Sequence, residues 1–190
     1  MGIKGTRTEQ NLLKAFAGES QARNRYTYFS GAARKEGFQQ IAALFLETAE
    51  NEREHAKVFF CHLEGGDAEI TASYPAGRIG TTAENLLAAA EGEKMEWSLL
   101  YPDFAEVADQ EGFPAVAESF REIGKVEAYH ERRYRKLLDN VENGKVFAKD
   151  RPIRWKCRNC GYVFEGPEAP AVCPACKHPQ DYYEVWDEAY

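Results

Sequence analysis

The sequence lacks any apolar run that approaches the roughly 18 residues needed to cross a bilayer. Its first residues, MGIKGTRTEQ, lack the apolar segment of a secretory signal. Positive charge is not in excess either, since 24 Lys and Arg face 31 Asp and Glu for a formal net charge of −7. We therefore expect a cytoplasmic protein, with neither a membrane nor a nucleic acid as its partner.

Proline is scarce up to about residue 145, where only three of the eight prolines lie. Apolar residues recur there at spacings of three and four, which is typical of amphipathic helices. Capping signals at Thr6 with Glu9 and at Thr81 with Glu84, and Pro114 at a helix start, help to delimit the helices. We predict four of them, over residues 7–34, 38–64, 82–109 and 114–142.

The connections between these helices predict how they are arranged. Short breaks, KEGF and DQEGFP, join the first helix to the second and the third to the fourth. The segment between Glu64 and Thr82 is long and rich in Gly, Pro and Thr. Short connections make antiparallel hairpins, so the sequence predicts a mainly α fold, a ferritin-like four-helix bundle with one long crossover.

Each predicted helix has an apolar seam that is interrupted near its middle by acidic residues. Two seams also carry the spacing Glu-x-x-His, which places both side chains on one helix face. The seam residues in question are Glu19; Glu52 and His55; Glu93 and Glu96; and Glu127 and His130. The two hairpins repeat this pattern, since Glu19 precedes Glu52 by 33 residues and Glu93 precedes Glu127 by 34.

Five buried carboxylates would repel one another and would each be costly to bury unpaired. Protonation could neutralise one or two of them, and the seams hold no Lys or Arg at these positions. Two metal ions are the remaining answer, with the imidazoles as neutral ligands. This is the carboxylate and histidine pattern of ferritin-like di-iron proteins. Glu96 has no counterpart in the first helix, and we predict that it can exchange with His55 as a ligand of one iron.

The composition changes after about residue 148, where aromatic residues, prolines and four cysteines appear. We predict domains at 1–148 and 149–190, and the second is too small to fold without a metal. Two CxxC pairs, Cys157 with Cys160 and Cys173 with Cys176, are spaced for a tetrahedral thiolate site. Zinc and iron both suit such a site. The aromatic residues nearby favour iron, because they could shield a redox-active centre. Cys61 stands apart, and we expect it to be a small buried side chain.

Several motifs together resemble the rubrerythrin family over nearly the whole chain. They are AFAGESQARNRY, EREHAK, EGEKMEW with LLYPDF, VEAYH, and WKCRNCGYVFEG with CPAC. The tail is similar to a rubredoxin, which favours iron over zinc, although Lys177 stands where rubredoxins often have Gly.

The resemblance implies a di-iron peroxidase that reduces hydrogen peroxide to water in defence against oxidative stress. It implies an oxo- and carboxylate-bridged pair of non-haem irons with Glu52 and Glu127 as bridges, and one rubredoxin-type iron bound by four cysteines. Tyr26 and Tyr101 match tyrosines near the iron pair. Electrons would come from a rubredoxin or an NAD(P)H-dependent rubredoxin reductase, and the chain would form a homodimer or a larger homo-oligomer.

Two other functions fit parts of the sequence. A ferroxidase or iron-handling protein would use the same bundle, but it would have no need of a built-in electron-transfer site. A non-enzymatic protein could carry a structural metal in the bundle and use the tail as a zinc ribbon for interaction.

Overall fold

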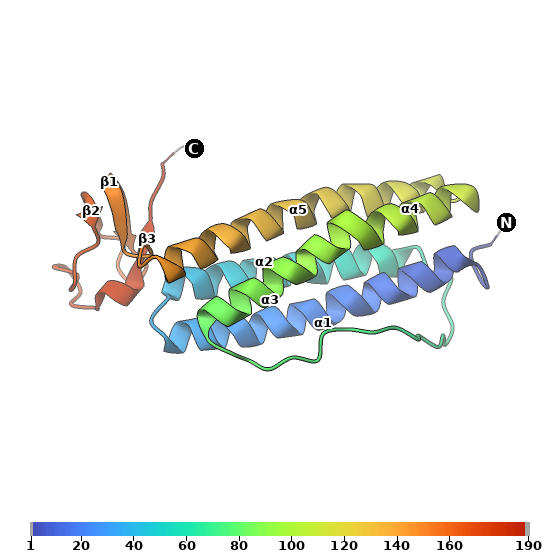
Figure 1. Ribbon diagram of the computed structural model, residues 1–190, viewed down its shortest axis with the longest axis horizontal. Helices are drawn as coiled ribbons and strands as arrows, with labels where there is room; N and C mark the ends of the chain where they lie inside the picture. Colours follow the sequence, from blue (N-terminus) through green and yellow to red (C-terminus); the bar gives the residue numbers. More distant parts are fainter. Residues whose placement is uncertain (1, 189–190) are drawn as a thin grey trace.

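The computed structural model describes residues 2–188 and consists of a helical bundle with a small sheet at one end (Figure 1). The helices are α1 (Arg7–Lys35), α2 (Gln39–Cys61), α3 (Thr82–Met95), η1 (Glu96–Leu100), α4 (Tyr101–Gln110) and α5 (Pro114–Glu142). The tail contains β1 (Ala148–Cys157), β2 (Val163–Glu168), η2 (Gln180–Tyr182) and β3 (Tyr183–Val185). The prediction of a mainly α, ferritin-like bundle with a small β-rich tail is confirmed.

Two antiparallel hairpins, α1–α2 and α3–α5, form the bundle, and an extended crossover runs along its length between them (Figure 1). The capping box at the start of α3 is complete, since Thr81 and Glu84 each bind the other's backbone amide. At α1 the Thr6 hydroxyl accepts from the Glu9 amide, but the Glu9 carboxylate accepts from Gly5 instead of Thr6. Pro114 is the first residue of α5, as predicted.

The third predicted helix is not one regular helix. A π-helical turn, η1, separates α3 from α4, and Pro102 follows it within the first turn of α4. Proline has no amide hydrogen to donate to the preceding turn, so a wider turn here has a local cause. The extra residue rotates the buried face. Tyr101 is buried, and Leu100 before it is partly buried against the same core cluster.

Two apolar clusters fill the bundle, and the acidic residues lie between them. One contains Leu12, Ala15, Phe59, Phe104 and Phe120, and the other contains Ala22, Phe29, Phe45, Leu86 and Tyr134. Glu19 follows the first cluster on α1 and precedes the second. The carboxylates therefore sit at the middle of a long, otherwise apolar core.

The tail is a three-stranded antiparallel sheet in the order β2-β1-β3. Trp155 is fully buried in it and donates from its indole nitrogen to the Gly166 carbonyl at 3.0 Å. The sheet packs on the end of the bundle, where Phe38 stacks on Phe147 with ring centroids 6.2 Å apart. The predicted domain boundary after residue 148 falls at the start of β1.

One prediction about the core is wrong. Cys61 is exposed at the last position of α2, although Phe59 in the same turn is buried in the core. Within residues 2–188, no helix is both long enough and apolar enough to span a membrane.

Candidate metal centres

Six of the seven predicted bundle ligands meet at the centre of the bundle. The carboxylates are almost completely buried, at 0 to 1% exposure for Glu19, Glu52, Glu93 and Glu127. His130 is 2% exposed, and the His55 side chain is 12% exposed. Each residue reaches the centre because its helix presents the middle of its apolar seam there.

The six residues fall into two overlapping groups of four. One group is Glu19, Glu52, His55 and Glu127, and the other is Glu52, Glu93, Glu127 and His130. Within each group the potential ligand atoms all lie within 4.8 Å of one another. Glu52 and Glu127 belong to both groups, so their carboxylates are placed to bridge two metal ions.

The atoms at this centre approach closely without forming hydrogen bonds. His55 Nδ1 lies 2.8 Å from oxygens of both Glu52 and Glu127, and His130 Nδ1 lies 2.8 Å from Glu127. In the described part of the chain, neither Nδ1 atom and none of the oxygens of Glu52 and Glu127 has a hydrogen-bond partner. Buried polar atoms are almost always satisfied. Lone pairs that converge in this way are the arrangement that metal ions require, so these residues fit a di-iron site.

When no metal is bound, burial and the charges of neighbouring residues shift the pKa values of the acidic and histidine side chains. Burial, followed by the neighbouring carboxylates, raises the pKa of both Glu19 and Glu93 well above its usual value. Burial alone would lower the pKa of the histidines, but nearby carboxylates outweigh it and raise the pKa to about 9 for His55 and about 12 for His130. Burial alone would raise the pKa of Glu127, but the two histidines outweigh it and lower that pKa to about 2.

These shifts predict how the metal-free protein responds to pH. A group whose pKa is raised by folding stabilises the folded state at low pH and loses that contribution as pH rises. Glu19 and Glu93 lose this contribution as pH rises above about 4.5, and the two histidines lose theirs as pH rises above about 6.5, whereas Glu127 loses its contribution only as pH falls from about 4.5 toward 2. We expect the melting temperature of the metal-free protein to fall between about pH 5 and pH 9.

Circular dichroism of the helices, recorded on metal-free and iron-loaded protein at several pH values, measures this effect. Iron binding becomes more favourable as its ligands lose protons. The difference in melting temperature between the two forms should therefore widen as pH rises. A metal-free protein that becomes more stable from pH 5 to pH 8 would contradict the expected burial of the carboxylates.

Two buried tyrosines hold the terminal carboxylates. The Tyr26 hydroxyl donates to Glu93 Oε1 at 2.5 Å, and the Tyr101 hydroxyl donates to Glu19 Oε1. Each contact joins residues from different helices of the bundle. Both hydroxyls thus have carboxylates as their partners, which favours a role in fixing the ligands.

Glu96 is the predicted ligand that the structure does not bring into either group. It lies in the first turn of η1, on the wall of a cavity of about 510 Å³ that is also lined by Gly18, Tyr101 and Tyr74. A Cβ atom at Gly18 would lie 3.9 Å from Glu96 Oε1 and 3.6 Å from the Tyr74 ring, at ordinary contact distance, which places Gly18 next to both residues.

The cavity contains polar groups that the sequence did not single out. Gln21 Oε1 and Arg25 Nε are buried and, among residues 2–188, have no hydrogen-bond partner. The crossover covers the cavity through Tyr74, whose hydroxyl donates to the Lys14 carbonyl at 2.7 Å. A small polar molecule next to Glu96 would find both a donor and an acceptor here. Both residues lie within the motif AFAGESQARNRY, and that position is the signal in the sequence that could have pointed to them.

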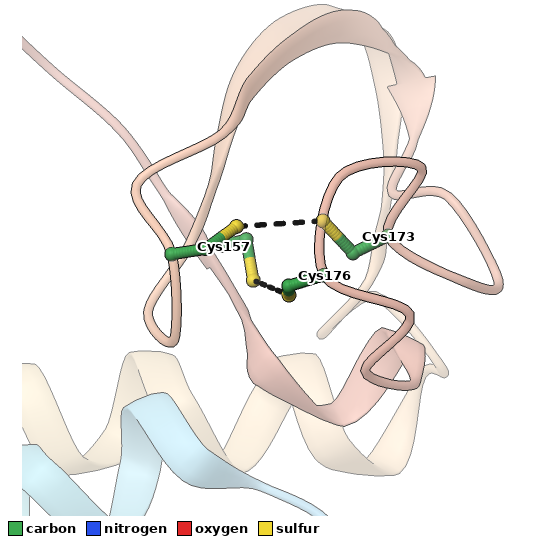
Figure 2. A group of neighbouring side chains, drawn as sticks. Cys157, Cys173 and Cys176 are labelled. Carbon is green, nitrogen blue, oxygen red and sulfur yellow. Dashed lines mark hydrogen bonds between the residues drawn. The ribbon is translucent and has the colours of Figure 1, made fainter.

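The four tail cysteines form a second centre (Figure 2). The Sγ atoms of Cys157 and Cys176 are 3.7 Å apart, and those of Cys160 and Cys173 are 3.6 Å apart. Sulfurs around a tetrahedral metal with bonds of about 2.3 Å lie about 3.8 Å from one another. The described cysteines therefore fit a single iron ion.

The two CxxC loops are equivalent in their backbone. Gly161 and Lys177 each follow the second cysteine of a pair, with φ values of 80° and 63°. Their amides donate to the carbonyls of Cys157 and Cys173 at 2.8 and 2.9 Å. Lys177 is the only described residue other than glycine with positive φ. A left-handed conformation costs about 1–2 kcal/mol for such a residue.

Backbone amides also point at the sulfurs. Cys176 accepts from the His178 amide, which is the main cause of its pKa being lowered to about 6, and Cys160 accepts from the Tyr162 amide in the equivalent loop. Such hydrogen bonds favour thiolates and tune the reduction potential of a bound iron.

Family comparisons agree with this division into two centres. The model of the family described as Rubrerythrin matches residues 10–138. The model described as Rubrerythrin, rubredoxin-like domain matches residues 155–184. The two models cover the helical bundle and the cysteine cluster respectively.

The chain is similar to curated proteins over almost its whole length. It is 63% identical to a rubrerythrin from Porphyromonas gingivalis, covering 99% of this chain and 94% of the relative. It is 52% identical to a rubrerythrin from Nitratidesulfovibrio vulgaris, covering 96% of each. Among solved structures, fully reduced, all-ferrous nigerythrin matches with a TM-score of 0.64 and 30% identity, covering 97% of this chain and 92% of that one.

Proposed function

The chain belongs to the rubrerythrin family, and from this we propose that it is a di-iron peroxidase that reduces hydrogen peroxide to water. Members of the family are oxidoreductases, and this chain has a di-iron carboxylate and histidine site and a four-cysteine iron site. The observation that carries the proposal is the presence of both sites in one chain. An iron bound by four cysteines delivers single electrons, and storage of iron does not require such a donor.

The reaction joins one peroxide molecule with two electrons and two protons to give two water molecules. When bound, the iron pair supplies the two electrons that cleavage of the O–O bond needs. Glu52 and Glu127 would hold both metals, Glu19 and His55 would complete one site, and Glu93 and His130 would complete the other. Tyr26 and Tyr101 fix the outer carboxylates through their hydroxyl groups.

Glu96 has a separate part in the proposal. It lines the cavity and lies close enough to Glu19 for its charge to raise the pKa of that carboxylate, so we propose it as the alternative to His55 at one metal. The cavity is the proposed entry for peroxide, which can accept a hydrogen bond from Arg25 Nε and donate one to Gln21 Oε1. Hydrogen peroxide is small and uncharged, so it can reach Glu96 without electrostatic steering.

The proposed electron donor is a rubredoxin or an NAD(P)H-dependent rubredoxin reductase in the cytoplasm. Helix α5 continues for twelve residues from His130 to its end at Glu142, which is about 18 Å at 1.5 Å per residue. The strands of the tail lie beyond that end (Figure 1), and β1 ends at Cys157 of the cysteine cluster. We therefore propose a homodimer or larger assembly, in which the cluster of one subunit can lie nearer to the iron pair of another.

Stopped-flow mixing of the anaerobically reduced protein with peroxide or with dioxygen tests the proposed activity. We expect peroxide to oxidise the iron pair at least about tenfold faster than dioxygen at equal concentration. The absorbance of the cysteine-bound iron, followed in the same experiment, should then show its oxidation after that of the pair. Faster oxidation by dioxygen would favour the ferroxidase alternative and contradict the peroxidase.

A further inference from the structure

A second large cavity, of about 840 Å³, lies where the tail meets the bundle. Its walls come from α2, α5, the connecting segment and strands β1 and β3. The two domains meet beside it, since the Val185 amide donates to Gln40 Oε1 at 3.3 Å. Small-molecule sites commonly have volumes of roughly 300–1,000 Å³. The cavity is therefore large enough for a ligand of nucleotide size.

Positive charge is concentrated on this cavity although the chain as a whole is acidic, with a net charge of −7. One carboxylate, Asp150, lines it beside five cationic side chains, which are Arg133, Lys136, Lys145, Lys149 and Arg151. A pocket lined by one sign of charge attracts ligands of the opposite sign.

Only part of this charge is balanced by ion pairs with carboxylates. Arg133 pairs with Glu47 at 2.5 Å, and Lys145 pairs with Asp150 at 2.9 Å. Lys149 instead donates to neutral acceptors, Asn140 Oδ1 at 3.0 Å and the Lys145 carbonyl at 2.6 Å.

The neighbouring positive charges affect Lys149. Burial, followed by the charges of Lys136 and Lys145, lowers the pKa of the Lys149 ammonium, against the opposing effect of Asp150 and Asp139. Arg133 also has a donor to spare, because its Nε atom is buried and, within the described residues, has no hydrogen-bond partner. An anion in the cavity would relieve the repulsion around Lys149.

The lining also has an apolar part. Five aliphatic side chains contribute to it, namely Ile41, Leu137, Val146, Ile153 and Val185. An inorganic anion would leave this surface in contact with water, whereas a ligand with an apolar or ring-containing part would cover it.

We propose that this interdomain cavity binds an organic phosphate of nucleotide size, with its phosphates against Lys136, Lys149 and Arg133 and its ring against the aliphatic side chains. The proposal does not depend on the reaction at the iron pair, because the cavity shares no ligand residue with either metal centre. A ligand bound there would contact both domains and stabilise their present arrangement.

Calorimetric titration of the iron-loaded protein with ADP tests the proposal. We expect saturable binding, and we expect it to be at least about tenfold weaker in the double variant Lys136→Gln with Lys149→Gln, which removes two charges with little loss of volume. The matched control is Lys57→Gln with Lys125→Gln. These lysines are exposed, lie outside the cavity and each pair with a Glu three residues earlier. This control should bind ADP like the unchanged protein.

Two further probes separate the parts of the ligand. Adenosine should bind at least about tenfold more weakly than ADP because it lacks phosphate, and pyrophosphate should bind more weakly because it lacks the ring. The visible absorbance of the cysteine-bound iron in every sample shows whether the protein remains intact. The proposal is wrong if ADP shows no saturable binding up to about 5 mM, if the cavity variant binds ADP as well as the control, or if adenosine or pyrophosphate matches ADP.

Discussion

Replacement of Glu127 with glutamine should remove both irons from the bundle and leave the iron of the cysteine cluster in place. Glu127 belongs to both ligand groups, is fully buried and has an oxygen 2.8 Å from each of His55 and His130. A neutral amide supplies one weak oxygen ligand in place of a charged bridge. We expect the iron affinity of the bundle to fall by about 100-fold or more, since changes to residues that only support a ligand already cost 10–100-fold.

The same change should destabilise the metal-free protein, because Glu127 is the counter-charge of two buried imidazoles. Loss of one partner of a buried ion pair costs about 3–5 kcal/mol. Metal analysis of the purified protein measures the first effect, with about three irons per chain expected to fall to about one. Glu118→Gln is the matched control, since Glu118 is exposed on the same helix. Retention of two bundle irons by the Glu127 variant would exclude a bridging role.

Replacement of Cys157 with serine should abolish turnover driven by an external reductant while the iron pair stays intact. Cys157 is a fully buried member of the cysteine group, and a serine oxygen is a poor ligand for a site that needs four thiolates. With the cysteine-bound iron lost, we expect steady-state peroxide reduction with a rubredoxin reductase to fall by about 100-fold or more. The reaction of the chemically reduced iron pair with peroxide should be unchanged in a single turnover.

Cys61→Ser provides the control for this experiment. Cys61 is a free, exposed thiol outside the cluster, so its replacement should change neither iron content nor turnover. If the Cys157 variant kept the full steady-state rate with two irons in the bundle, the cluster would lie outside the electron path. If its single-turnover reaction also failed, the change would have damaged the bundle.

The meeting of the carboxylates in the bundle core was predictable, because a carboxylate at the middle of an apolar seam is buried and needs a partner that offsets its charge. Glu19, Glu52, Glu93 and Glu127 each interrupt a run of helical positions that would otherwise all be apolar. Helical periodicity fixes the face on which a side chain lies, and the matching depth in four helices fixes where the faces meet. The four cysteines were equally predictable from their spacing. The family confirms the two kinds of metal centre, whereas the assignment of individual ligand residues stays a prediction.

The features that the sequence did not predict depend on local backbone geometry. A regular period of 3.6 residues cannot anticipate the π-helical turn at η1, although Pro102 was a signal for it. Glu96 lies in that turn and outside both ligand groups, and Tyr101, the residue after the turn, is buried in the core. Cys61 was assigned to the interior from its apolar neighbours, but its position at the end of α2 exposes it.

The crossover between Leu63 and Thr81 links the two hairpins covalently. Most of its residues are exposed, so it does this without packing closely on the bundle. Both metal sites take ligands from both hairpins, so the iron pair clamps two halves that the crossover keeps at high effective concentration. Doubling the length of such a loop costs only about 0.6 kcal/mol in closure entropy. Selection for stability therefore constrains its sequence weakly, and Tyr74 is free to serve the cavity that it covers.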